Sequence, residues 1–319
     1  MWRFLFLLSL FATAQSIAAI PGLSGHYSKA LVFSQINAIQ NYPATKSSSC
    51  QTQLTDMTKD NELTILVAFG YMDFSAGQDV VDSGSSLYNL GSVLDPDALE
   101  AFSTALTRSC TTAGFSSKNQ AFACGFRKSG NSFSKNITNQ FSGKKTRVSI
   151  KLVNSAYSSN DAQNKAKYTS QQNQKSQNAQ NQFLSALQNY DAVLYLGHAR
   201  SGGGPDFFPP RLLKNGHVDY GYYKKNKPGL KAMLGALNGA RGADLIGLLA
   251  CKSTGLFASS VKKYSSHSAL ITADSLFDFD DLVPTGFTVI EALVSQRCNE
   301  NFSNVVQSHL SSDQLSIFF

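Results

Sequence analysis

The chain has 319 residues, of which 42% are hydrophobic, which is enough for one large α/β domain with a sizeable core or for two small domains. Its net charge of +7 comes from small, scattered basic groups rather than one basic face, which favours solvated surface over a nucleic-acid-binding patch. We therefore expect no nucleic-acid partner. No stretch approaches the roughly 20 apolar residues of a membrane-spanning helix, so we also expect no stable membrane insertion.

The N-terminus has the pattern of a secretory signal peptide. Arg3 precedes an apolar run from Phe4 to Phe11, and two possible cleavage sites with small residues at their first and third positions follow at Ala12-Thr13-Ala14 and Ser16-Ile17-Ala18. A membrane helix is the alternative, but the apolar run is far shorter than the roughly 20 residues that a span needs. We assign residues 1–19 to the signal peptide and 20–60 to an N-terminal extension. The mature protein is expected to be secreted or periplasmic.

The five cysteines suggest disulfide bonds, because an exported protein meets oxidising conditions. Cys110 and Cys124 flank a Gly- and Ser-rich turn and are the first candidate pair. Cys50 and Cys298 are the second. This pairing would leave Cys251 with a thiol, as a reactive cysteine requires.

From residue 61 onward, apolar strand patterns alternate with helical patterns. In chain order we predict a strand at 62–70, a helix at 95–110, a hairpin-bearing loop at 111–146, a strand at 146–156, a helix at 160–189, a strand at 191–197, a helix at 227–240, a strand at 243–251, a helix at 254–264, a strand at 268–274 and a helix at 285–297. Asp95 is the expected cap of the first helix, with Pro96 at its first position. The helix at 160–189 holds 14 Asn or Gln residues, so a prion-like tract is its alternative.

This alternation predicts the fold class. Parallel strands need crossover connections, so strands that alternate with helices indicate a mostly parallel sheet covered on both faces. We expect a three-layer α/β sandwich with a mostly parallel central sheet over residues 61–319.

Two of the predicted strands end on reactive side chains. The third ends at Gly197-His198 and the fourth at Ala250-Cys251, 53 residues later. The working site of such sheets lies beyond the carboxyl ends of the strands, and consecutive strands are usually neighbours. A lone His or Cys at a strand end is usually packed or hydrogen-bonded. The occurrence of both at matching strand ends favours a catalytic role for the pair.

The chemistry expected of this pair is nucleophilic catalysis. A helix start just after Cys251, with Ser253 and Thr254 as capping residues, would favour the thiolate. His198 would act as general base to the thiol or as general acid to the departing amine. The backbone N–H groups of Ala199 and Cys251 are candidates for an oxyanion hole.

The segments LYLGHARSGGG and LIGLLACKSTG resemble the signature of caspase-fold cysteine peptidases, the superfamily of caspases, legumain, gingipains, clostripain and separase. The resemblance implies a caspase-like fold over 61–319, with His198 as the catalytic histidine and Cys251 as the nucleophile. It also implies that the N–H of Ala199, where the family usually has Gly, helps to hold the oxyanion. Aspartate specificity is not implied, because the sequence around Cys251 does not resemble that of a caspase.

Other polar groups have less specific interpretations. Asp274 and Asp278 follow the fifth strand and could select Arg or Lys before the cut bond, bind calcium or belong to a solvated loop. His217 and Tyr220 could flank the substrate, although packing roles are common for both. The five histidines lack metal-ligand spacing, so we expect no metal and no cofactor.

The function expected from these features is that of an exported cysteine endopeptidase acting on a peptide or protein. The alternatives are a catalytically silent caspase-like binding or scaffold protein of the cell envelope or exterior, and an esterase or amidase with the same His198 and Cys251 dyad.

Overall fold

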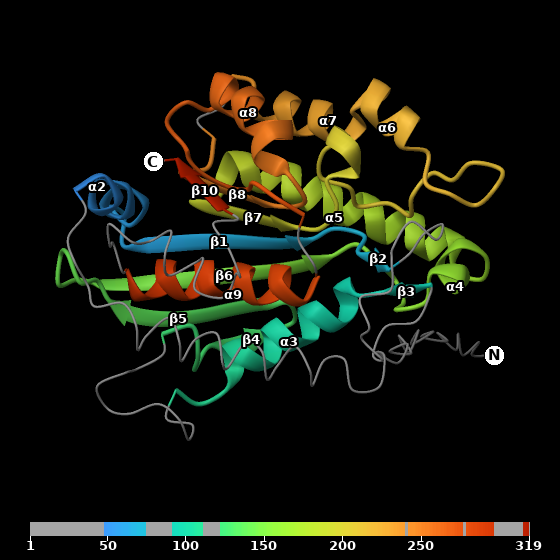
Figure 1. Cartoon of the computed structure of the whole chain (residues 1–319). Coiled ribbons are helices and arrows are strands. Elements are labelled where there is room, and N and C mark those ends of the chain that lie inside the picture. Colours follow the sequence, from blue (N-terminus) through green and yellow to red (C-terminus); the bar gives the residue numbers. More distant parts are fainter. Residues whose placement is uncertain are drawn as a thin grey trace, which may run out of the picture.

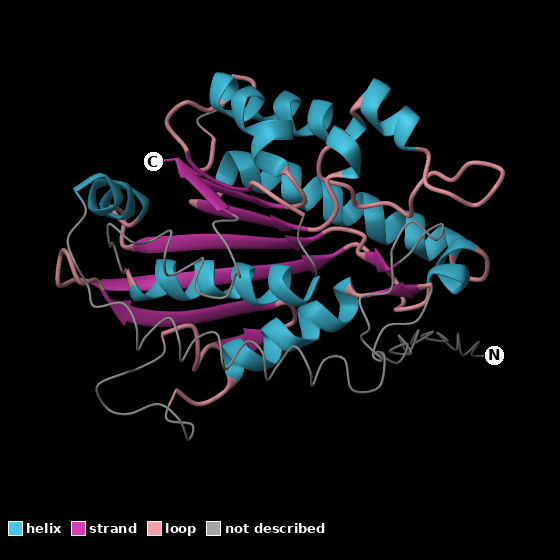
Figure 2. Ribbon diagram, in the orientation of Figure 1, coloured by secondary structure: helices cyan, strands magenta, loops and turns pink. Residues whose placement is uncertain are grey.

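The computed structural model describes residues 48–74, 91–110, 122–239, 242–276, 279–296 and 315–318. In these ranges a central sheet lies between two layers of helices (Figures 1 and 2). The predicted three-layer α/β architecture is therefore confirmed. The predicted signal peptide, 1–19, lies outside the described residues.

The elements have the following bounds. The strands of the central sheet are β1 (Glu62–Phe69), β4 (Arg127–Ser129), β5 (Ser132–Thr138), β6 (Lys145–Asn154), β7 (Ala192–Leu196), β8 (Leu245–Leu249), β9 (Ala269–Ala273) and β10 (Leu315–Phe318). The helices are α2 (Ser48–Met57), α3 (Asp95–Thr107), α4 (Asp161–Lys165), α5 (Thr169–Asn189), α6 (Tyr220–Asn226), α7 (Pro228–Leu237), α8 (Ser259–Tyr264) and α9 (Phe279–Ser295). Short elements are the paired strands β2 (Asp73–Phe74) and β3 (Ser92–Val93), the 3₁₀ turn η1 (Arg200–Gly202) and the π-helical turn η2 (Thr254–Ala258).

The strand order of the sheet determines where a site can form. The eight strands run in the order β10-β9-β8-β7-β1-β6-β5-β4, and the five central strands from β9 to β6 are parallel. The chain first adds β6 on one side of β1 and then crosses to β7 on the other side. The carboxyl ends of β1 and β7 therefore form a topological switch point, where open α/β sheets usually hold their ligands.

Two apolar layers hold the helices to the sheet. One layer packs α2, α3 and α9 against the sheet face that carries Ile65, Val67 and Val148. The other packs α5, α7 and α8 against the opposite face, which carries Leu66 and Val193. Strands buried on both faces form continuous apolar runs, so they can be recognised in the sequence.

Several elements differ from the sequence-based expectation. Helix α2 lies in the predicted extension, 20–60, yet its Leu54 and Met57 are buried in the first apolar layer. Helix α6 and strand β10 were not predicted. Helix α9 begins at Phe279 rather than 285 and includes Pro284, whose missing N–H costs only one hydrogen bond near the helix start.

Two cysteine expectations fall within the described ranges. Cys110 and Cys124 form a disulfide, with Cα atoms 5.3 Å apart. Cys50 is also disulfide-bonded, whereas Cys251 is a thiol. The expected pairing of Cys50 with Cys298 involves a residue outside the described ones.

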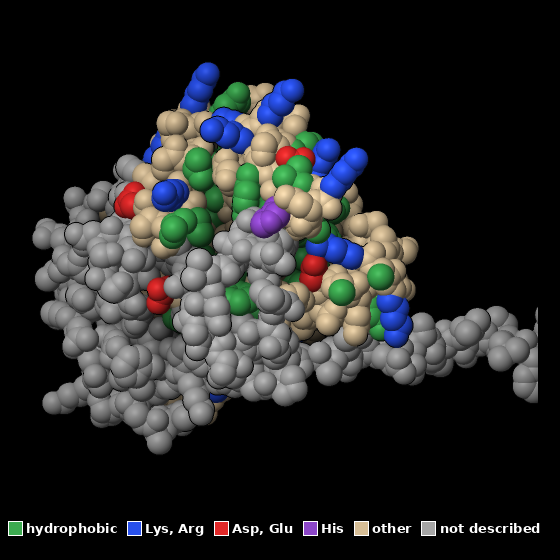
Figure 3. Space-filling view, turned by 45° about the vertical axis from the view of Figure 1, so that its right-hand side comes forward, with side chains coloured by type: hydrophobic (Ala, Val, Ile, Leu, Met, Phe, Trp, Pro, Cys, Tyr) green, Lys and Arg blue, Asp and Glu red, His purple; other side chains and the backbone are tan. Residues whose placement is uncertain are grey.

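Basic charge and membrane-spanning length were both considered in the sequence. Lysine and arginine side chains stand in separate groups over the described part of the face in Figure 3, rather than in one stripe. None of the helices in the described ranges is long and apolar enough to cross a membrane.

Asp95 is buried at the start of α3 and does not cap the helix as expected. The helix has no side-chain cap, and the Asp95 carboxylate instead accepts hydrogen bonds from the backbone N–H groups of Ser155 (2.9 Å) and Ala156 (2.6 Å). Burial raises the pKa of Asp95 to about 7, because these hydrogen bonds offset only part of the lost hydration.

The titration of Asp95 predicts a pH-dependent stability. The folded state favours the protonated acid. Its stabilising contribution to the free energy of unfolding is therefore complete below pH 3.8 and is lost as pH rises through about 7. In the wild type, we expect the free energy of unfolding to fall by up to about 4 kcal/mol over this window. Asp95→Asn lacks the titrating group and should not show this fall. Urea denaturation at several pH values measures it, with Asp60→Asn on an exposed turn as control. Parallel pH profiles for Asp95→Asn and the wild type would contradict the prediction.

Candidate active site

A pocket of ≈ 510 Å³ opens at the carboxyl ends of β7 and β8. His198 lies two residues after β7, and Cys251 two residues after β8. Both residues line this pocket. The parallel pairing of β7 with β8 brings the two predicted side chains to one edge of the sheet, although they are 53 residues apart.

The imidazole of His198 is oriented by the segment that follows β1. Its Nε2 lies 3.1 Å from the backbone oxygen of Asp73 and 3.4 Å from Asp73 Oδ1. A carbonyl oxygen can only accept, so Nε2 must carry the hydrogen and Nδ1 the lone pair in the neutral ring. The ring of Phe279 packs edge-on against the imidazole, with centroids 5.2 Å apart. The ring is thus held from two sides, with Nδ1 as its basic nitrogen.

Asp73 belongs to a buried ion network that includes Arg200. The Arg200 guanidinium bonds to the Asp73 carboxylate through Nη2 and to Asp206 Oδ2 through Nε, at 2.9 Å. The side chains of Asp73 and Arg200 are each 2% exposed. Burial alone would raise the pKa of Asp73, but the charges of Arg200 and His198 hold that pKa well below its usual range. Asp73 is therefore an anion that faces the imidazole.

Tyr195 braces the loop that carries His198. Its buried hydroxyl donates to the backbone oxygen of His198 (2.9 Å) and accepts from the N–H of Asp206 (2.8 Å). A Cβ on Gly197 would lie 2.6 Å from this hydroxyl, and one on Gly70 would lie 2.4 Å from it. Both strand ends therefore require glycine, which explains the Gly197-His198 pair in the sequence.

Cys251 lies on a sharp turn between β8 and η2. Lys252, the next residue, has a left-handed φ of 55°. Ser253 does not cap the following helix: its hydroxyl donates to the oxygen of Leu248 (2.6 Å) and accepts from the N–H of Ala273 (2.8 Å). The expected capping role is wrong because this hydroxyl ties the turn to two strands. The turn that presents Cys251 is thereby fixed to the sheet.

Backbone strain is concentrated at the pocket. Six non-glycine residues of the described chain have positive φ, and three of them, Arg200, Ser201 and Lys252, line the pocket. Such conformations cost of order 1 kcal/mol or more each and cluster at functional sites.

Ala199, whose backbone N–H is the expected oxyanion donor, lines the pocket. Ala199 has a φ of −85°, and its N–H donates to no acceptor in the described part of the chain. Buried N–H groups are almost always paired, so a donor without an acceptor at a pocket indicates a place for a ligand oxygen.

The other predicted substrate contacts have mixed outcomes. Tyr220 lines the pocket, whereas His217 does not. Asp274 is exposed just after β9 and is not among the pocket residues, and Asp278 lies outside the described residues. The described lining contains three cations, Arg200, Lys224 and Lys252, and no carboxylate.

Asp73, Arg200 and Asp206 are functional candidates that the sequence analysis missed. Asp73 follows β1, whose carboxyl end lies at the same sheet edge as that of β7, so its position after an apolar strand was the available sequence signal. Arg200 and Asp206 lie in the Gly-rich loop after His198, where charge offered a weaker signal.

Comparison of the chain with protein-family models, curated proteins and solved structures finds no match. Within the described ranges, no three His, Cys, Asp or Glu side chains are close enough to hold a metal ion.

Proposed function

We propose that the protein is an exported cysteine endopeptidase with a caspase-like fold. The observation that carries the proposal is the shared pocket of His198 and Cys251 at the carboxyl edge of a mostly parallel sheet. The likeness to caspase-fold peptidases depends on the two sequence segments that end in these residues. The disulfide between Cys110 and Cys124 supports export, since such bonds persist in oxidising compartments.

The proposed reaction begins with attack of the Cys251 sulfur on a peptide carbonyl carbon. His198 Nδ1 takes the thiol proton and passes it to the departing amine, while its Nε2–H stays bonded to the Asp73 oxygen. The Asp73 carboxylate stabilises the imidazolium that forms between these two transfers. Water then attacks the thioester carbonyl carbon while Nδ1 takes one of its protons. The C–S bond breaks, the carboxylic acid is released, and Nδ1 returns the proton to the Cys251 sulfur.

The oxyanion of the tetrahedral intermediate needs a donor in this pocket. The N–H of Ala199 is suited to this role because no described group accepts from it. Lys224 and Lys252 favour acidic or neutral residues near the cut bond over basic ones. The Arg or Lys preference considered for Asp274 therefore has little support from the pocket lining.

Reaction of the thiol with iodoacetamide tests the proposal. At pH 6 an ordinary thiol, with a pKa of about 8.5, is almost entirely protonated. We expect Cys251 to be alkylated at least about tenfold faster than free cysteine at this pH, and His198→Ala to abolish the difference. Mass spectrometry of the digested protein locates and quantifies the label.

The same measurement separates the peptidase from the scaffold alternative. Alkylation of Cys251 no faster than that of free cysteine, and unchanged in His198→Ala, would favour a catalytically silent binding protein. The disulfide of Cys110 and Cys124 keeps both of these sulfurs out of the reaction.

A further inference from the structure

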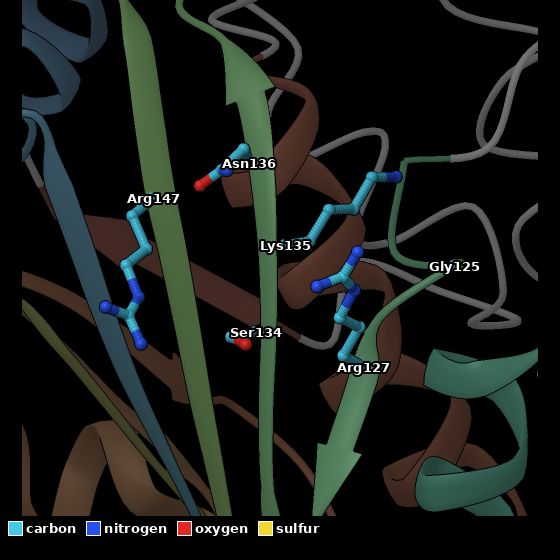
Figure 4. A pocket seen from close by; sticks show the side chains of 6 residues that line it. All are labelled: Gly125, Arg127, Ser134, Lys135, Asn136 and Arg147. Carbon is cyan, nitrogen blue, oxygen red and sulfur yellow. The ribbon is translucent and has the colours of Figure 1, made fainter.

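One face of β4, β5 and the first part of β6 is not covered by any helix in the described ranges, whereas α5 packs over the end of β6 at Val153. Figure 4 looks onto this face, and α3 and α9 lie behind the strands. Along β6, Val148 and Ile150 are buried toward these helices, whereas Arg147, Ser149 and Lys151 lie on the opposite side. The alternation of a strand therefore gives this part of the sheet one apolar and one polar face.

Strand register gathers polar side chains on the uncovered side. Arg127 pairs with Ser134, Ser134 with Ser149, and Asn136 with Arg147. Two hollows of ≈ 460 and ≈ 220 Å³ share Arg127, Ser134 and Arg147, so they adjoin each other on this side of the sheet. The open sheet face is defined here by Arg127, Ser134, Asn136, Arg147, Ser149 and Lys151.

The cations of the open sheet face have no anionic partners in the described part of the chain. No ion pair within the described ranges includes Arg127, Arg147 or Lys151. Glu62, the first residue of β1, lies in register with Arg147 at the edge of this face. Lys135 differs, because its ammonium group is bonded to the backbone oxygens of Phe122 and Cys124. Three solvated cations on one polar face are complementary to an extended anion.

We propose that the open sheet face binds an anionic polysaccharide. Strands lie about 4.8 Å apart and rise about 3.4 Å per residue, so the Cα atoms of Arg127, Arg147 and Lys151 are spaced at roughly 12–14 Å. Anionic groups along a sugar chain can meet cations spread in this way, and Ser134, Asn136 and Ser149 offer hydrogen bonds to sugar hydroxyls. Single-stranded nucleic acid needs aromatic stacking platforms, and among the described lining residues only Tyr190, half-buried, could offer one.

The open sheet face is separate from the candidate active site. The two hollows share no lining residue with the pocket of His198 and Cys251. A bound polysaccharide would therefore hold the protein at an anionic surface while the pocket stays accessible. Binding does not depend on the proposed peptidase activity, so Cys251→Ala should retain it.

Titration with dextran sulfate, using neutral dextran of equal length as reference, tests the proposal by calorimetry. We expect the wild type to bind dextran sulfate and not dextran. A cation that faces an anionic surface contributes roughly fivefold in affinity, so the triple variant Arg127→Gln, Arg147→Gln, Lys151→Gln should bind about a hundredfold more weakly. The substituted residues are exposed or half-buried, and the thermal unfolding midpoint verifies that the variant folds.

The control variant removes the same charge elsewhere. Lys225→Gln, Lys231→Gln and Lys263→Gln change three exposed lysines on α6, α7 and α8, and this variant should bind nearly as well as the wild type. Equal losses in both variants would reduce the effect to net charge and overturn the proposal. Absence of binding, or equally tight binding of oligothymidine through the same residues, would also overturn it.

Discussion

Replacement of Cys251 with alanine is expected to abolish peptide hydrolysis and to leave the fold intact. If the thiol is the nucleophile, its loss should lower kcat by at least about 10⁴-fold, leaving only the contribution of binding and the oxyanion donor. Cys251 is half-buried, and truncation by one sulfur atom should change stability little. The assay is cleavage of a peptide library varied at the residue before the cut bond, followed by mass spectrometry.

Two histidines provide a matched pair for the same assay. His198 Nε2 lies 3.1 Å from the Asp73 oxygen, and His267 Nε2 lies 3.1 Å from the oxygen of Gly242. Only the first of them lines the pocket. His198→Ala should lose activity as Cys251→Ala does, whereas His267→Ala should keep it. Undiminished cleavage by Cys251→Ala would remove the proposed mechanism, and cleavage mainly after Arg or Lys would contradict the effect inferred for Lys224 and Lys252.

The second large effect is expected from Arg200→Gln. This change leaves the buried carboxylate of Asp73 and the partly buried carboxylate of Asp206 without their cation, and uncompensated buried charge typically costs about 3–5 kcal/mol. Burial opposes the charge of Arg200, yet its two carboxylate partners raise its pKa further, so the network is ionic at neutral pH. Urea denaturation with the disulfides intact measures the loss.

An exposed pair gives the control for this experiment. Arg211 lies 3.1 Å from Asp219 but its side chain is 60% exposed, so Arg211→Gln should cost less than about 1 kcal/mol. The double variant Arg200→Gln, Asp206→Asn should recover part of the loss, because one of the two carboxylates that lost the cation is then replaced by a neutral amide. A cost for Arg200→Gln no greater than that for Arg211→Gln would show that the buried network does not stabilise the fold.

Local sequence patterns identified most of the architecture. The apolar runs at 62–70 and 191–197 correspond to β1 and β7, because a strand buried on both faces is apolar along its whole length. Helix α6 has seven residues and only Tyr223 buried, so it has little apolar periodicity to recognise. Strand β10 joins the sheet edge through backbone pairing with β9, which leaves little trace in composition.

His198 and Cys251 could be singled out from the sequence because each directly follows an apolar strand. The prediction that the two residues lie at one site depended on two general rules. Consecutive parallel strands tend to be neighbours, and their carboxyl ends meet at one edge of the sheet. The structure has both features. Their proposed catalytic roles stay a prediction, which the Cys251 and His198 variants test.

The contacts made by buried charges required the tertiary structure. Arg200 meets Asp73 across 127 positions of sequence, and the open sheet face appears only when β4, β5 and β6 are paired in register. Apolar periodicity is a local property, set by which side of a strand or helix is buried. Contact between distant charges depends on strand order and register, which are decided by the packing of the whole sheet.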